Sequence, residues 1–142
     1  MSYAHILVAV DLSDSSRVVI DKAIAMARDA NSKVSFVFVD HDRVALESKD
    51  EQKLMQELDA LAKQSDYPIS ETMVVVGDLH IKLAGIAKEN DIDLVVCGHH
   101  HKFMSRLFSS IPKLANAIEA DLLVVYLDCA LTQDYKVKGR LC

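Results

Sequence analysis

Several residue types are scarce in this sequence, and their scarcity argues against a disulfide framework and against a glycine-rich phosphate site. The 142 residues include no tryptophan, four glycines, two prolines and three cysteines. An odd and small number of cysteines does not make a disulfide framework, so we expect reduced thiols and a reducing compartment. Four glycines are too few to lead us to expect a glycine-rich phosphate cradle.

Long apolar runs and positive charge are scarce as well. No apolar stretch approaches the roughly 20 residues that span a bilayer, and residues 1–5 lack the basic and apolar regions of a signal peptide. The formal net charge of −5 argues against a nucleic acid or an anionic membrane bound through bulk charge. We therefore expect a cytoplasmic protein with neither kind of partner.

Hydrophobic residues are plentiful, at 51% of the chain. This share is enough for one core in a chain of single-domain length. We expect one domain over residues 1–128, followed by a flexible polar tail over residues 129–142.

Five short apolar runs alternate with segments of helical periodicity. Continuous apolar runs are typical of strands buried on both faces of a parallel sheet. The runs occupy residues 6–10, 34–39, 73–76, 94–97 and 122–127. The first and the fourth are the most thoroughly apolar for their length, which favours central positions.

The segments between the runs predict four helices, because their apolar residues recur every three or four positions. The expected inward-facing residues are Val19, Ile20, Ala23, Ile24 and Ala27, then Leu54, Met55, Leu58, Leu61 and Ala62, then Leu79, Leu83, Ile86 and Ala87, and finally Leu114, Ala115 and Ile118. Strict alternation of strands and helices predicts an α/β fold with a five-stranded parallel sheet and helices on both faces.

A ligand site in such a fold is expected beyond the carboxyl ends of the strands. The residues at those ends are Asp11, the segment 40–42, Gly77 and Asp78, which we expect to form the exit turn of the third strand, and the segment 98–101. No Walker A sequence, G-x-G-x-x-G pattern or G-x-S-x-G nucleophile elbow is present. Asp11 suits a cap for the following helix as well as a ligand contact, and Gly98 suits a turn that ends the fourth strand.

Three stretches carry a resemblance to a known family. They are HILVAVD at residues 5–11, GDL at residues 77–79 and DLVVCGHH at residues 93–100, followed by Phe103, Ser105, Leu107, Ser109 and Ser110. They resemble universal stress proteins, in particular the A type of enteric bacteria. The resemblance implies a Rossmann-like, adenine nucleotide alpha hydrolase-like sheet of order 3-2-1-4-5 and a cytoplasmic protein of bacterial stress resistance.

One branch of the resembled family binds ATP through a loop after the fourth strand. The loop is spaced glycine, two residues, glycine, nine residues, glycine, then serine or threonine. Counted from Gly98, the later positions hold His101, Ile111 and Pro112. An imidazole adds bulk where bare backbone would meet phosphate, and proline removes an N–H donor. We therefore expect a member of the family without cofactor or enzymatic activity.

The alternative is a divergent sensor of ATP or AMP, or a slow ATPase. Its remnant nucleotide site would comprise Asp11, Gly98, Ser109 and Ser110. The resemblance places Asp11 near the adenosine, and a shift of two residues would bring the two serines near the missing hydroxyl.

The three consecutive histidines of residues 99–101 suggest a metal hypothesis, since imidazole suits zinc, nickel or copper. His41 and His80 belong to the same expected edge of the sheet. However, adjacent histidines in a loop point in different directions, and no H-E-x-x-H or cysteine pair accompanies them. We expect no metal site. We also expect Cys97, inside its strand, to be a buried and inert thiol.

The last apolar run is the one stretch that favours assembly. An edge strand leaves N–H and C=O groups that need covering, and pairing with a two-fold mate closes the assembly. The resemblance likewise implies a homodimer through the last strand, with Leu123, Val124, Val125 and Tyr126 at the interface. Mixed dimers with related chains remain open, and protein partners are unknown.

Overall fold

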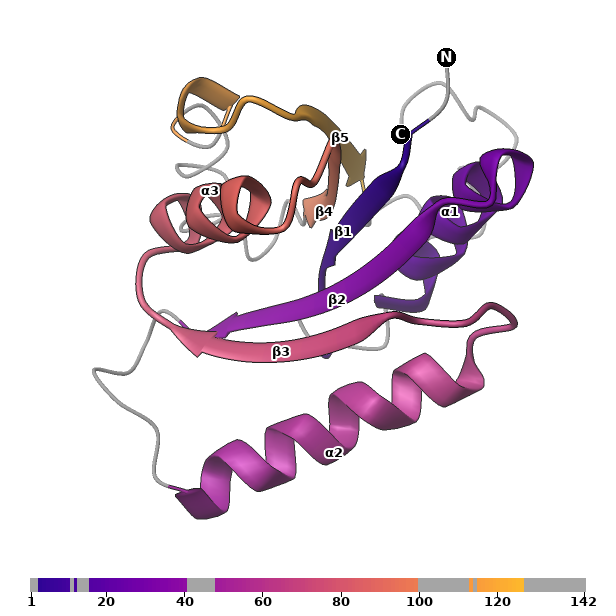
Figure 1. The fold of residues 1–142 in the computed structure, drawn as a ribbon. Helices are drawn as coiled ribbons and strands as arrows, with labels where there is room; N and C mark the ends of the chain where they lie inside the picture. The colour runs from indigo at the N-terminus through magenta and orange to yellow at the C-terminus, as the bar shows by residue number, and fades with distance from the viewer. Residues whose placement is uncertain are drawn as a thin grey trace.

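Strands and helices alternate along the chain in the computed structural model, which describes residues 3–10, 12, 16–40, 48–99, 113 and 115–126 (Figure 1). The strands are β1 (His5–Ala9), β2 (Lys33–Asp40), β3 (Glu71–Val76), β4 (Leu94–His99) and β5 (Asp121–Tyr126). The helices with defined bounds are α1 (Ser16–Ala30), α2 (Ser48–Gln64) and α3 (Leu79–Glu89).

The strands form one parallel sheet in the order β3-β2-β1-β4-β5. This confirms the predicted α/β class and the sheet order that the resemblance implies. β1 occupies the centre, and its residues Ile6, Leu7 and Val8 are fully buried. β4 lies beside it, so the two most apolar runs do take interior positions.

The ends of two strands differ from the prediction. β3 begins at Glu71, ahead of the apolar run, because Glu71 already pairs with Ser35 of β2. β4 continues past the apolar run, since Gly98 pairs with Val125 and His99 pairs with Tyr126 of β5. The prediction that Gly98 ends the strand and makes a turn is therefore wrong. Ladder pairing with β5 extends β4, and the hydropathy of single residues does not report that pairing.

Two hydrophobic layers cover the two faces of the sheet. Along β1, Ile6 and Val8 belong to the layer beneath α1 and α2, whereas Leu7 belongs to the layer beneath α3. Figure 1 shows α3 on the opposite side of the sheet from α1 and α2. A strand buried on both faces explains why its sequence is continuously apolar.

The helices meet these layers largely as their periodicity predicts. α1 buries all five predicted residues: Val19, Ile20, Ala23, Ile24 and Ala27. α3 buries Leu83, Ile86 and Ala87. On α2 only Leu58 is fully buried, because this helix packs over β3 at the edge of the sheet. α2 also ends before Tyr67-Pro68, as the proline requires.

The fourth predicted helix is described only in part. Residues 113 and 115–117 are helical, and Ile118 is buried in the layer beneath α3, as predicted. Ala115 is exposed, so its assignment to the inner face is wrong. Leu114 lies outside the described residues.

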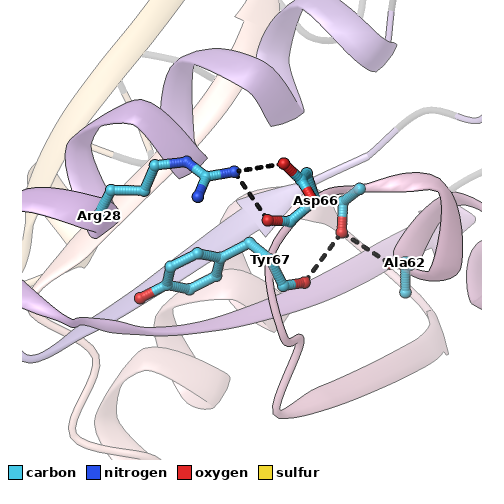
Figure 2. A network of polar contacts seen from close by, with 5 residues as sticks. Arg28, Ala62, Asp66 and Tyr67 are labelled. Atoms are coloured by element: carbon cyan, nitrogen blue, oxygen red, sulfur yellow. Dashed lines mark hydrogen bonds and ion pairs between the residues drawn. The ribbon is translucent and has the colours of Figure 1, made fainter.

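A polar network fastens the loop after α2 to the end of α1 (Figure 2). Arg28 Nη2 donates to the backbone oxygen of Asp66 at 2.7 Å, and its guanidinium lies 5.7 Å from the centre of the Tyr67 ring. The Tyr67 hydroxyl donates to the backbone oxygen of Ser32 at 2.6 Å. These contacts belong to the amino ends of the strands, opposite the edge where a ligand is expected.

Candidate functional site

Only part of the carboxyl edge falls within the described residues. Of the remnant nucleotide residues, Gly98 is described, and it lies within β4. Asp11, Ser109 and Ser110 lie outside the described residues. The predicted grouping of these four residues therefore stays a prediction.

The exit of β1 has an unusual backbone geometry. Val10 N donates to Val37 O of β2 at 2.8 Å, so the strand is still tied to its neighbour there. Leu12 then takes a φ of 62° while its side chain packs against the layer beneath α1 and α2. A left-handed conformation costs a leucine about 1–2 kcal/mol, and such strain is commonly found at functional turns. The sequence gives no sign of it, because leucine has no preference for this region.

The exit of β3 is a turn that requires glycine, as the sequence predicts. Gly77 has a φ of 142°, and its N–H donates to Asp40 O at 3.2 Å. A Cβ at this position would lie 2.6 Å from Cε of Lys82, whose side chain folds over the turn. Asp78 then takes the N-cap position of α3 with extended backbone, but its side chain makes no cap hydrogen bond. The turn thus brings Asp40, Asp78 and Lys82 to one end of the sheet.

Of the five histidines expected at the carboxyl edge of the sheet, two belong to the described residues. His80 lies in the first turn of α3 and His99 is the last residue of β4, whereas His41, His100 and His101 fall outside the described residues. Among the residues whose placement is described, no group of three or more histidine, cysteine or acidic side chains could hold a metal ion.

Cys97 is buried inside β4, as predicted, with 1% of its surface exposed. Burial raises the pKa of its thiol to about 12, because an apolar surrounding disfavours the thiolate. A thiol in this state is a poor nucleophile and a poor metal ligand. Cys129 and Cys142 lie outside the described residues.

β5 forms one edge of the sheet in the described part of the chain. It pairs with β4 from Leu94↔Asp121 to His99↔Tyr126. Leu122, Leu123 and Val124 are half-buried and Val125 is buried. After Asp121 the strand carries no charge, so its outer edge offers backbone hydrogen-bonding groups among apolar side chains. This edge is the candidate interface.

A shallow hollow of about 170 Å³ lies elsewhere, between α1 and the end of α2. Ile20 and Leu61 contribute apolar lining, and Arg17 donates to Gln64 Oε1 across the hollow at 3.0 Å. Neighbouring side chains therefore already satisfy part of its polar lining, and it adds no chemistry to the site.

A five-stranded parallel sheet with this strand order and with helices on both faces belongs to the Rossmann-like class of α/β proteins. The model of the universal stress protein family matches residues 2–126, and the chain belongs to that family. No helix in the described ranges is long and apolar enough to cross a membrane.

Individual relatives agree with this assignment. Universal stress protein A of Escherichia coli strain K12 is 42% identical over 139 residues, covering 89% of this chain and 96% of that protein. A universal stress protein solved in complex with cAMP has a TM-score of 0.70 at 24% identity, covering 89% of this chain and 99% of that one. The universal stress protein from Archaeoglobus fulgidus in complex with dAMP has a TM-score of 0.67 at 21% identity, with coverages of 88% and 99%.

Proposed function

We propose that this protein acts in bacterial stress resistance in the cytoplasm as a homodimer joined through β5, without ATP binding or catalysis. The observation that carries the homodimer is the outer edge of β5. Asp121 N donates to Asp93 O of the segment leading into β4 at 3.1 Å, so Asp121, Leu123 and Val125 turn their backbone groups toward β4. By alternation, Leu122, Val124 and Tyr126 turn theirs outward.

Within the described residues, this edge lacks the features that prevent edge strands from pairing with other strands. Edge strands are commonly guarded by charged side chains, proline or a covering segment. β5 has one charge, at Asp121, and the Tyr3 hydroxyl holds that carboxylate at 2.8 Å. The opposite edge differs: Thr72 of β3 donates to Asp59 of α2, and Lys82 folds over Gly77 where β3 ends. A second copy of β5 would cover the open groups symmetrically.

Relatives support the role in stress resistance, since universal stress protein A of enteric bacteria is 42% identical over most of the chain. The expected lack of ATP binding rests on the loop after β4, where histidine, isoleucine and proline stand at positions 101, 111 and 112. The loop's first glycine, Gly98, is a strand residue beside Val125.

Two measurements test this function. Sedimentation equilibrium at micromolar concentration should give twice the 15.7 kDa mass of the chain, and a monomer would contradict the homodimer. Calorimetric titration with ATP or AMP in saturating Mg²⁺ should give no saturable heat. A single site of micromolar affinity would contradict the absence of nucleotide binding while leaving the homodimer intact.

A second candidate is an adenine-nucleotide sensor with a divergent loop or a slow ATPase. It is favoured by the solved proteins of the same fold that hold cAMP and dAMP. Freshly purified protein would then release bound nucleotide on heating, with excess absorbance at the nucleotide wavelength. Titration with cAMP alongside ATP and AMP separates a monophosphate site from a triphosphate site. A spectrum without that absorbance, together with flat titrations, would exclude the sensor.

A further inference from the structure

β3 forms the other edge of the sheet, and among the described residues no strand pairs with its outer side (Figure 1). Gly77 N donates to Asp40 O of β2, so the backbone groups of β3 alternate between facing β2 and facing outward. The residues that face outward are Thr72, Val74 and Val76. Contacts with Asp59 and Lys82 lie at the two ends of β3, and the middle of the edge remains available to an added strand.

The side chains of β3 are half-buried on both faces of the sheet. Val74 packs into the layer beneath α1 and α2, whereas Met73 and Val75 pack into the layer beneath α3. α2 packs over β3 itself, and α3 packs over β2, so the space beside β3 is more open on the α3 face. An added strand would therefore place its apolar side chains next to Met73 and Val75.

Opposite charges flank this apolar stretch on the α3 face. Glu71 begins β3 on the same face as Met73 and Val75, by alternation, and its side chain is exposed. At the other end of the strand, Lys82 of α3 folds over Gly77. Neither Glu71 nor Lys82 forms an ion pair within the described ranges. The edge therefore presents a negative charge where β3 begins and a positive charge where it ends.

We propose that the outer edge of β3 binds an extended peptide segment of a partner protein as an added antiparallel strand. The segment carries an acidic residue that meets Lys82, two apolar residues in alternate positions that meet Val75 and Met73, and then a basic residue that meets Glu71. Antiparallel pairing is slightly more stable per residue than parallel pairing. It also makes Met73 and Val75 non-hydrogen-bonded pairs with the peptide, with Cα atoms about 4.5 Å apart. This partner surface is separate from the proposed homodimer, which uses the other edge of the sheet.

A second copy of β3 does not fit the same edge. A two-fold axis between the two strands would place the α2 helices of both copies on the same face, one over each β3. Adjacent strands lie about 4.7–4.9 Å apart, whereas packed helices need about 8–10 Å between their axes. The two helices would therefore overlap. A peptide segment without a helix does not meet this obstacle.

A capped, fluorescently labelled peptide of sequence Glu-Thr-Val-Thr-Val-Thr-Lys matches the charges and the alternation of the site. Fluorescence anisotropy with the full-length protein should show saturable binding. The charge-reversed peptide Lys-Thr-Val-Thr-Val-Thr-Glu should bind about fivefold more weakly, because like charges then meet at both ends. N-methylation of the central threonine, opposite Val74, should weaken binding about tenfold, because the peptide then loses a backbone hydrogen bond to Val74 O.

Variants of the protein make the test specific to this edge. Val74→Pro removes an outward N–H and should weaken binding of the first peptide at least about tenfold. Val124→Pro, on the outer edge of β5, is the matched control and should leave peptide binding unchanged whether or not the homodimer persists. The double variant Glu71→Lys with Lys82→Glu should reverse the preference, so that it binds the charge-reversed peptide more tightly.

The contrary outcomes are distinct from a failure of the homodimer. Equal affinity for the two charged peptides, or no saturable binding of either, would overturn the peptide site. An unchanged preference in the double variant would do the same, because Glu71 and Lys82 would then not face the peptide. Binding lost in Val124→Pro and kept in Val74→Pro would place the peptide on β5 instead. Assemblies larger than the dimer that Val74→Pro abolishes would show that a second copy occupies the β3 edge.

Discussion

Tyr3 and Asp121 are 118 residues apart, and the hydroxyl of Tyr3 donates a 2.8 Å hydrogen bond to Oδ2 of Asp121. This bond ties the segment before the central strand to the first residue of the edge strand. Asp93 lies between them: its carboxylate accepts from the backbone N–H groups of Ala4 and His5, and its backbone oxygen accepts from Asp121 N. The amino ends of β1, β4 and β5 are thus one connected network.

Asp121→Asn should make the Tyr3 phenol easier to ionise. In the native protein the pKa of Tyr3 lies above its ordinary value of 10.0, first because the phenol donates to Asp121, then through burial and the charges of Asp121 and Asp93. Ultraviolet titration of tyrosinate should therefore show ionisation at lower pH in the variant than in the wild type. Tyr3→Phe identifies which part of the signal belongs to Tyr3. An unchanged titration would mean that the contact is absent in solution.

The Cys97 thiol should resist modification in the native protein. Its pKa of about 12, raised from 9.0 by burial, keeps it un-ionised at pH 8. In protein carrying Cys129→Ser and Cys142→Ser, an aromatic disulfide reagent should react only after denaturation. Between pH 9 and 12 the unfolded state loses this proton and the folded state keeps it, so the contribution of Cys97 to stability should fall as pH rises. Rapid reaction of the native thiol would contradict the burial.

Gly77→Ala should destabilise the protein by about 1–3 kcal/mol. The residue has a φ of 142°, and an added Cβ would lie against the Lys82 side chain. Gly85→Ala is the matched control, since a Cβ there meets nothing within 4 Å. That helical substitution should stabilise by about 0.5–1 kcal/mol. Urea unfolding measures both changes, and equal effects of the same sign would refute the special role of the β3 exit turn.

Asp93→Ala should cost about 2–3 kcal/mol, because two backbone N–H groups lose a charged acceptor. The donors are Ala4 N and His5 N, at 2.8 and 2.9 Å. Asp91→Gly is a suitable control, because Asp91 has a φ of 53° that glycine adopts readily. Denaturant midpoints compare the two variants. If Asp93→Ala lowered stability no more than the control, the hydrogen bonds from Ala4 N and His5 N to the Asp93 carboxylate would not contribute to stability.

The sequence was sufficient for the features that depend on hydropathy. The apolar run at β1 and the stripe of α1 predict buried residues correctly. Burial on both faces makes a strand continuously apolar, and burial on one face makes apolar residues recur every three or four positions in a helix. Features set by pairing between distant segments were not predictable in this way. Gly98 remains in β4 because β5 extends the ladder, and Ala115 is exposed although its spacing is helical.

The candidate site was predictable to a smaller extent. Gly77 was identified as a turn, since glycine marks positive φ, but the left-handed Leu12 and the Tyr3–Asp121 bond had no local signal. The nucleotide remnant depends mainly on Asp11, Ser109 and Ser110, which lie outside the described residues. The apolar run predicts the strand at the edge of the sheet, and its outward backbone pattern comes only from the hydrogen bonds of the sheet.

Sedimentation of Val124→Pro tests the β5 homodimer most directly. Proline at this position removes an N–H that faces away from β4, so the sheet within one chain keeps its hydrogen bonds. Val74→Pro is the matched control on β3. There Gly77 N donates to Asp40 O, so Val74, by alternation, also turns its N–H outward. The wild type and Val74→Pro should sediment as dimers and Val124→Pro as a folded monomer. A Val124→Pro protein that remains as dimeric as the wild type would contradict the proposed interface.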